Sequence, residues 1–305
     1  MRIRATVAAV TGALALSAFV APAALAADGS KAPVGVAAAD KAAHTASSGK
    51  AAFSAAAATG TPYELNATFS NIKINKGGDI VVGAAAVVKA PVTFTLTHGN
   101  DVDIHAADFV SAVEVYRGAD FANSDDWIDS SNAKCTDTSA TAANCTATVT
   151  LDPSRLLNSQ AGSWKAAAFA VAFNGEDPNN PNLDNVGVAT KDNVATPRLQ
   201  RLSKLTVNAA PEPVKKGKTI TVTGKLARAN WETSKYAGYA GQPVKLQFRK
   251  KNSSTYTTLK TIKTDSTGNL KTTTTATVDG FFRYSFAGTS TTPAVNAAGD
   301  YVDVQ

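Results

Sequence analysis

The segment from Val278 to Gly288, VDGFFRYSFAG, decides the fold of the C-terminal part of this chain. Successive side chains of an extended strand point to opposite faces, so Phe282, Tyr284 and Phe286 share one face. The residues between them, Arg283 among them, share the other. The aromatic row is therefore either a platform for a ligand or the inner face of a buried sheet.

A second segment, VKLQF, repeats the pattern and favours the buried sheet. Val244, Leu246 and Phe248 alternate with polar residues in the same way. Rows that agree in phase are typical of strands that bury one face against the opposing sheet of a sandwich. Burying one phenylalanine contributes about 1.5–3 kcal/mol, and a small domain without a disulfide depends on such contributions. We therefore expect the aromatic row to be core.

Residues 201–305 contain several short segments of this kind, separated by turns. The segments are KLTVNA, KTITVTGKL, QPVKLQFRK, TYTTLKTIKT, NLKTTTTATV, FFRYSFAG and DYVDV. Turn-forming residues lie between them, as in KKGK, AGQP and DSTGN. This length and this series of strands predict an immunoglobulin-like β-sandwich.

The same region resembles the bacterial Ig-like repeats of secreted and surface proteins from high-GC Gram-positive bacteria. The resemblance covers residues 203–305. It rests on the V-K-L strand at Val244–Leu246, the T-D-x-x-G turn at Thr264–Gly268 and the aromatic strand at Phe282–Gly288. It implies a modular exported protein in which the domain spaces, sticks or stiffens, and it implies no catalytic residues.

Residues 61–200 also alternate with a period of two. The segments PYELNATFSNIKI, APVTFTLTHG, DFVSAVEVYRG, CTATVTL and SWKAAAFAVAFNG are separated by Asp, Asn, Gly or Ser clusters. Short strands without intervening amphipathic helices predict a sandwich or barrel. We therefore expect an all-β protein of two tandem β-sandwich domains.

The N-terminus has the layout of a secretory leader. Basic Arg2 and Arg4 precede an alanine-rich apolar stretch and a small-residue site before Ala27. This pattern predicts a signal peptide over residues 1–26 and a secreted protein without a membrane anchor. Residues 27–60 are rich in alanine and lack an apolar stripe, so they predict a flexible spacer.

Charge is distributed unevenly along the chain. Residues 27–201 carry 13 basic and 18 acidic side chains, whereas residues 202–305 carry 15 basic and 6 acidic ones. A basic domain favours polyanions. For an exported bacterial protein these are cell-wall polymers or acidic glycans, with nucleic acid a more remote partner. The alternative is that the lysines keep sheet edges soluble.

Cys135 and Cys145 are the two cysteines of the chain. In an exported protein a pair at this spacing predicts one disulfide. Closing so short a loop contributes about 2–3 kcal/mol.

Three acidic stretches are candidate metal sites, and one of them is the loop NGEDPNNPNLDN with Glu176, Asp177 and Asp184, which could hold calcium. In THGNDVDIHAAD, Asp101, Asp103 and His105 would share one face of a strand, with His98 nearby. These residues could ligate zinc, or their carboxylates calcium. The alternative is a hairpin end with a polar outer face.

The loop ANSDDWIDSSN is the second stretch, and it brings Asp125, Asp126 and Asp129 together. It does not follow the EF-hand pattern, which calcium loops of β-sandwiches do not require. Calcium therefore remains an open alternative, and we expect no other cofactor.

The candidate ligand-binding residues lie in NWETSKYAGYAG and just before it. Trp231, Tyr236 and Tyr239 supply planar rings for a sugar or base face, with Lys235 and Arg228 near an anionic group. The alternative is that Trp231 folds back to cover the end of the sandwich.

Catalytic motifs are absent from the sequence. There is no G-x-S-x-G, H-E-x-x-H, C-x-x-C or P-loop segment. We therefore expect a non-enzymatic binding or structural module that acts at or outside the cell wall. The rival from another class is a metal-dependent hydrolase built on His98, Asp101, Asp103 and His105.

Overall fold

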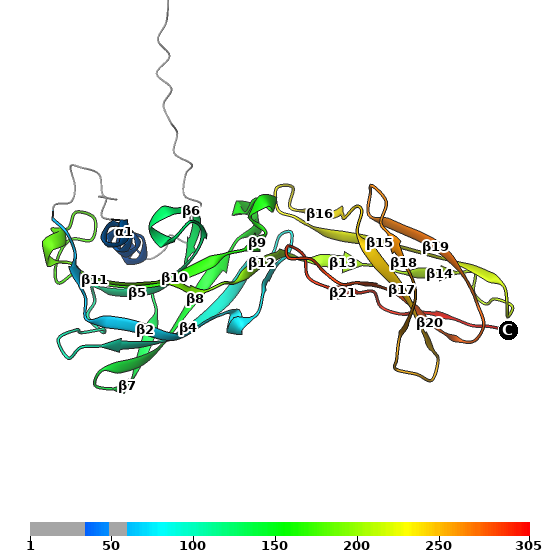
Figure 1. Ribbon diagram of the computed structural model, residues 1–305, viewed down its shortest axis with the longest axis horizontal. Helices are drawn as coiled ribbons and strands as arrows, with labels where there is room; N and C mark the ends of the chain where they lie inside the picture. Colours follow the sequence, from blue (N-terminus) through cyan, green and yellow to red (C-terminus); the bar gives the residue numbers. More distant parts are fainter. Residues whose placement is uncertain (1–33, 49–59) are drawn as a thin grey trace, which may run out of the picture.

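The computed structural model describes residues 34–48 and 60–305 and contains two β-sandwich domains arranged end to end (Figure 1). The predicted leader and the remaining parts of the predicted spacer lie outside the described residues. The all-β fold with an immunoglobulin-like C-terminal domain is confirmed. Among the described residues, no helix is long and apolar enough to cross a membrane.

The N-terminal domain packs two large sheets against each other. The first has the order β1 (Tyr63–Glu64), β11 (Gly187–Ala195), β10 (Lys165–Ala172), β5 (Phe109–Gly118) and β6 (Ser124–Asp129). The second has the order β2 (Ala67–Ile74), β4 (Val88–His98), β8 (Ala142–Leu151) and β7 (Lys134–Ser139). A small third sheet, at the end nearer the C-terminal domain, contains β3 (Ile80–Val82), β12 (Arg198–Arg201) and β9 (Gly162–Ser163).

The C-terminal domain is built from two sheets around one core. In one, β13 (Ser203–Leu205), β14 (Asn208–Ala210), β16 (Lys235–Gly238) and β19 (Asn269–Thr275) all pair with the long β15 (Thr219–Asn230). In the other, β17 (Pro243–Lys250) lies between β18 (Thr257–Lys263) and β20 (Gly280–Phe286). Strands β21 (Val295–Asn296) and β22 (Asp300–Val302) complete this second sheet at β20.

The aromatic row of β20 forms the centre of the C-terminal core, as the alternation predicts. Phe282, Tyr284 and Phe286 are buried, and the register sets Tyr284 opposite Leu246 and Phe286 opposite Val244. Each aromatic side chain therefore meets an apolar partner on the neighbouring strand, and the row offers no open face to a ligand.

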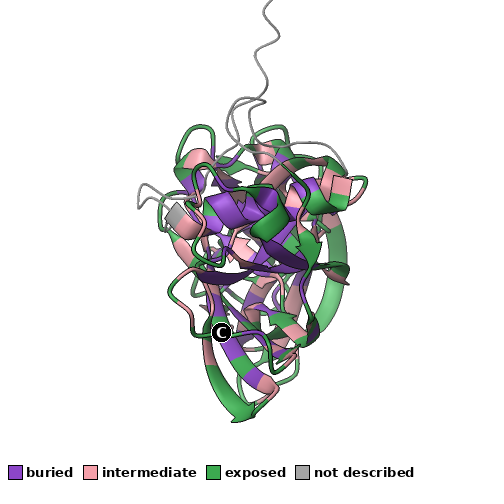
Figure 2. Ribbon diagram, turned by 90° about the vertical axis from the view of Figure 1, so that its left-hand side faces the viewer, coloured by how far each residue is buried: buried purple, intermediate pink, exposed green. Residues whose placement is uncertain are grey.

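The expectation of a flexible spacer does not hold for residues 34–48, which form helix α1 (Val34–Ser48). This helix covers the outer face of the sheet that contains β10 and β5, and Figure 2 shows it lying over buried strands. Its buried face consists of small side chains, including Ala39 and Ala43. Small side chains allow the helix to approach the alanine-rich β10 closely, so no stripe of large apolar residues is needed.

The predicted disulfide between Cys135 and Cys145 is present. The two residues are directly opposite each other on the edge strand β7 and its neighbour β8. The disulfide therefore fixes an edge hairpin of the N-terminal domain.

Candidate functional site

The outer face of the C-terminal sheet is the candidate binding surface. Because the inward positions of β17 and β20 are apolar, the residues between them point away from the core. The register aligns Lys245 with Ser285, Gln247 with Arg283 and Arg249 with Phe281. We call this surface, together with the adjoining Tyr256, Tyr301 and Lys251, the cation–aromatic face.

Arg283 is held in place from two sides. Its Nε donates a hydrogen bond of 2.9 Å to Oε1 of Gln247. Its guanidinium carbon lies 3.8 Å from the centroid of the Tyr256 ring. A guanidinium stacked on a ring keeps its N–H groups directed outward, where they can meet an anion.

Arg249 has a similar arrangement on the next strand. Its guanidinium carbon lies 3.8 Å from the centroid of the Phe281 ring, and its Nη1 donates to the Ser253 carbonyl at 2.9 Å. The centroids of Phe281 and Tyr301 are 5.1 Å apart. Two stacked arginines and three rings therefore form one continuous layer over β17, β20 and β22.

Positive charge predominates on this face. Lys245 and Arg249 on β17, Lys263 on β18 and Arg283 on β20 all occupy outward positions, and no outward position of these three strands is acidic. Such a face attracts anions, and the attraction weakens with salt because the charges are exposed.

One acidic residue, Asp279, lies at the rim of the face. It accepts hydrogen bonds from the Val304 backbone N–H and the Tyr301 hydroxyl, and Lys251 lies 3.5 Å away. These contacts lower the pKa of Asp279, the Val304 hydrogen bond most. Tyr301 and Asp279 in turn raise the pKa of Lys251, so the rim remains an ordered ion pair.

The structure places the predicted aromatic ligand residues in contacts within the protein. Trp231 is buried, and its indole Nε1 donates to the Gly83 carbonyl at 3.0 Å, so it fills the joint between the domains. Arg228 stacks on Tyr239 at 3.8 Å. Tyr236 is covered by Lys204 at 3.8 Å. Lys235, at the start of β16, is exposed.

The first predicted metal cluster does not come together. The segment that carries Asp101, Asp103 and His105 forms turns in place of the expected strand. Asp103 accepts the backbone N–H of His105, and the His105 ring instead contacts Asp137 at 2.9 Å. The ring of His98 contacts the Gly99 carbonyl. A turn does not align alternate side chains as a strand does, and Asp101, Asp103 and His105 are not among the described residues whose ligand atoms lie close enough together to hold a metal.

The second predicted cluster is divided between two faces of β6. Asp125 is exposed, and Asp126 pairs with Arg117 at 3.2 Å. Asp129 instead has a buried carboxylate oxygen and lies opposite Glu114 on β5.

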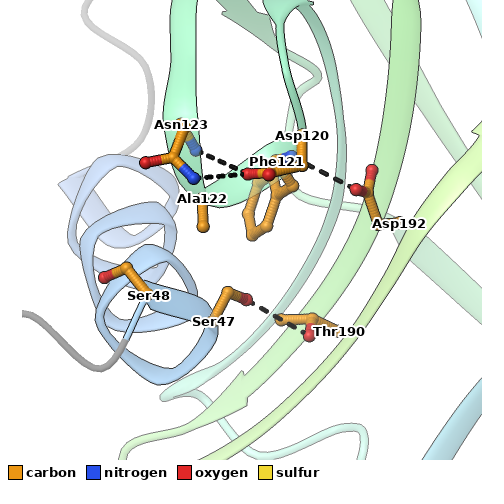
Figure 3. A pocket seen from close by; sticks show the side chains of 8 residues that line it. All are labelled: Ser47, Ser48, Asp120, Phe121, Ala122, Asn123, Thr190 and Asp192. Carbon is orange, nitrogen blue, oxygen red and sulfur yellow. Dashed lines mark hydrogen bonds between the residues drawn. The ribbon is translucent and has the colours of Figure 1, made fainter.

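An open cleft of about 480 Å³ lies where the end of α1 meets β11 and the short 3-10 helix η2 (Phe121–Asn123). Figure 3 shows Asp120 and Asp192 at this cleft. Asp120 accepts from Asn123, and Asp192 accepts from the Tyr116 hydroxyl at 2.5 Å and from the Phe121 N–H. Burial and Asp192 raise the pKa of Tyr116. Both carboxylates are thus used in hydrogen bonds within the protein. None of the described residues that line the cleft is a histidine, cysteine or lysine.

The alternating pattern predicts that Phe281 and Arg283 face away from the core row, but it does not predict which residues they contact. Their neighbours Tyr256, just before β18, and Tyr301, on β22, come from other parts of the sheet, and no spacing along the chain brings them together. The signal that could identify them is the row of outward basic residues on three consecutive strands.

This chain shows only low similarity to known proteins. No family model and no curated protein matches this chain. Among solved structures, the adhesin InvE of Yersinia pseudotuberculosis is similar over 78% of this chain at 15% identity, with a TM-score of 0.25. This chain spans 58% of the length of that structure.

Two further structures are similar at the same level. An I-band fragment of titin matches over 78% of this chain and 65% of its own length, at 11% identity and a TM-score of 0.28. A domain of intimin matches over 76% of this chain and 98% of its own length, at 15% identity and a TM-score of 0.24. At these scores the likeness carries no conclusion about function.

Proposed function

We propose that this chain is an exported, non-enzymatic binding module whose C-terminal domain holds anionic polymers of the cell envelope on the cation–aromatic face. The observation that carries the proposal is the pair of ring-stacked arginines on a face with no outward acidic residue on β17, β18 or β20. The leader pattern and the disulfide support export. The resemblance to Ig-like repeats supports an origin in a high-GC Gram-positive bacterium.

The chemistry of the face fits phosphate-bearing or acidic glycan chains. Arginine presents a rigid fork of N–H donors that matches phosphate or carboxylate oxygens. The rings of Tyr256 and Tyr301 flank these donors, and aromatic side chains at surfaces combine apolar area with a polar tip. A polymer that alternates anionic groups with sugar rings would use both kinds of group.

The test is a binding series with an anionic wall polymer and with a neutral glycan such as chitin. We expect the polymer to bind the purified chain, and moderate salt to release it because exposed charges are screened. Replacing Lys245 and Arg283 together by glutamine removes two cations from the face. Each exposed contact contributes about 0.2–1 kcal/mol, so the affinity should fall by about two- to thirtyfold.

The matched control is the double replacement of Lys225 and Lys271 by glutamine. These lysines lie on β15 and β19 of the opposite sheet. The change in net charge is the same, because each double variant removes two positive charges. The control variant should retain the affinity of the unmodified chain within about twofold. Equal losses in both double variants would mean that only net charge matters, and salt-independent retention would also contradict the proposal.

A further inference from the structure

A second constellation of ionisable side chains lies beneath α1. Asp40 and His44 are one helical turn apart, so both point toward the sheet from the same side of the helix. His44 Nε2 lies 3.3 Å from Asp40 Oδ1 and 3.0 Å from Glu114 Oε2. Glu114 projects from the middle of β5, and Asp129 is its direct partner on β6.

These groups are buried without enough partners. Glu114 is fully buried, and its Oε1 has no hydrogen-bond partner among the described residues. Asp129 Oδ1, opposite Glu114 on the neighbouring strand, is also buried and accepts no hydrogen bond there, and the buried Asp40 Oδ1 has only its contact with His44 at 3.3 Å. Buried polar oxygens are nearly always satisfied in proteins, so these under-satisfied oxygens indicate a ligand that the described residues do not supply.

Charge balance leads to the same conclusion. Three carboxylates surround one imidazole, and a protonated His44 would offset only one of the three negative charges. Like charges directly opposite each other on neighbouring strands, as Glu114 and Asp129 are, destabilise a sheet. The groups that interact electrostatically with Asp129 are Asp40, Glu114 and His44. Among the described residues no lysine or arginine is one of these groups, so a bound cation would relieve the excess of negative charge that protonation of the carboxyl groups must otherwise remove.

The ionisation of the cluster reflects this imbalance. Burial raises the pKa of Glu114 to about 8, and Asp40 adds to the rise. Burial likewise raises the pKa of Asp129. Burial opposes the charge on His44, but its hydrogen bonds to Asp40 and Glu114 outweigh that effect and raise its pKa to about 10.

We propose that Asp40, His44 and Glu114 bind a divalent metal ion of the zinc class between α1 and the sheet, with Asp129 opposite Glu114 on the neighbouring strand. One ligand atom from each of Asp40, His44 and Glu114 lies within 4.8 Å of the others. Ligand bonds of about 2.0–2.1 Å in a tetrahedral site place ligand atoms about 3.3 Å apart. The two separations measured from His44 Nε2, 3.0 and 3.3 Å, are close to that spacing.

The donor set selects the kind of metal. An imidazole nitrogen together with carboxylate oxygens suits zinc and neighbouring transition metals, whereas calcium and magnesium prefer oxygen donors alone. The ion would connect helix α1 to strand β5. The buried face of α1 consists of small side chains, each of which buries little apolar area. Metal ligation would therefore strengthen the attachment of α1 to the sheet.

A route to the site begins at the cleft beside α1. Phe121 lines that cleft, and its ring lies 4.1 Å, centroid to centroid, from the His44 ring, which is itself partly exposed. A shift of the Phe121 side chain would therefore bring His44 into contact with the cleft shown in Figure 3.

The test measures zinc binding to the purified chain after chelation. We expect one zinc ion per chain by elemental analysis. We also expect Tm to rise by about 5–10 °C when free zinc exceeds Kd about a hundredfold. His44→Gln and Asp40→Asn should each weaken zinc binding at least tenfold, because each removes one ligand. His105→Gln is the control, since His105 is an exposed histidine paired with a carboxylate.

Cobalt provides a readout that does not depend on the variants. Co²⁺ bound to the unmodified chain should give visible absorption bands of tetrahedral nitrogen–oxygen ligation, and added zinc should remove them. Several results would overturn the proposal: no metal on the unmodified chain, stabilisation by calcium alone, loss of zinc in His105→Gln, or unchanged zinc affinity in a folded His44→Gln variant. Circular dichroism establishes which variants fold.

Discussion

Residues one position apart on β20 have entirely different surroundings. Tyr284 is fully buried between the sheets, whereas its neighbour Arg283 lies on the cation–aromatic face. The Tyr284 hydroxyl donates a hydrogen bond of 2.9 Å to the Val222 carbonyl on the opposite sheet. This bond satisfies the one polar atom of the aromatic row and fixes the two sheets relative to each other.

The ionisation of Tyr284 should be visible at alkaline pH. Burial raises its pKa to about 12 from the ordinary value of 10.0. A folded-state pKa above the unfolded one means that the phenol stabilises the fold fully below pH 10 and loses this contribution as pH rises toward 12. The free energy of unfolding, measured in urea from pH 9 to 12, should therefore fall more steeply for the unmodified chain than for Tyr284→Phe.

Tyr63→Phe is the control for this comparison, because Tyr63 is exposed and lies outside the core. This control variant should lose stability over the same pH range as the unmodified chain. Identical profiles for the unmodified chain and Tyr284→Phe would contradict a buried phenol. At neutral pH, Tyr284→Phe should cost about 1 kcal/mol, the usual net contribution of one hydrogen bond.

At the scale of elements, α1 shows what hydrophobic patterning overlooks. The helix buries Val36, Ala39 and Ala43 against a sheet whose strand β10 is itself rich in alanine. A search for large apolar residues at helical spacing finds nothing in such a sequence. The available signal lies in the sheet, because β5 and β10 have buried residues at consecutive positions. A strand that is buried on both faces needs a covering layer on each side.

The close fit of α1 predicts a clear response to overpacking. Ala43→Leu inserts a large side chain into the buried contact and should cost about 1–3 kcal/mol. Ala46→Leu makes the same change at an exposed position of the same helix, so it should alter stability by less than about 0.5 kcal/mol. Thermal unfolding of both variants checks this. Equal effects would mean that α1 does not pack on the sheet through Ala43.

Local rules predict the strands, the core row and the disulfide well, because these depend on alternation and on short spacings. The candidate sites depend on register between distant strands. Glu114 lies opposite Asp129 only because β5 pairs with β6, and Glu114 contacts His44 only because α1 packs on β5. Arg283 and Tyr256 are likewise brought together by the sheet. Residue spacing along the chain does not contain that information, so the sequence identifies single members of each site but not the sets.

At the scale of the whole molecule, the joint between the domains is the decisive feature. The chain passes from β12 to β13 through Leu202 alone. Trp231 belongs to the C-terminal domain by sequence, but its indole packs into the core of the N-terminal domain. The Arg201 side chain donates to the Ala229 carbonyl at 2.6 Å, and the Arg201 backbone N–H donates to the Thr291 carbonyl. The domains are therefore connected by buried contacts and not by a free linker.

Removing the Trp231 side chain should loosen this joint. Trp231→Ala leaves a large cavity between the domains and should lower stability by about 3–5 kcal/mol. Small-angle X-ray scattering should also show a broader distribution of overall dimensions. Trp164→Ala is the control, because Trp164 is equally buried but lies within the N-terminal domain. It should lower stability by a similar amount and leave the scattering profile unchanged. A compact, unaltered profile for Trp231→Ala would contradict the role of the joint.

A rigid contact between the domains also determines how the N-terminal domain is held when the C-terminal domain binds a polymer. The cation–aromatic face and helix α1 belong to domains at opposite ends of the long axis (Figure 1). If the C-terminal domain were bound to a surface, the N-terminal domain would be held at a fixed distance and in a fixed orientation. Copies of the chain arrayed on a polymer would then all extend their N-terminal domains to the same distance.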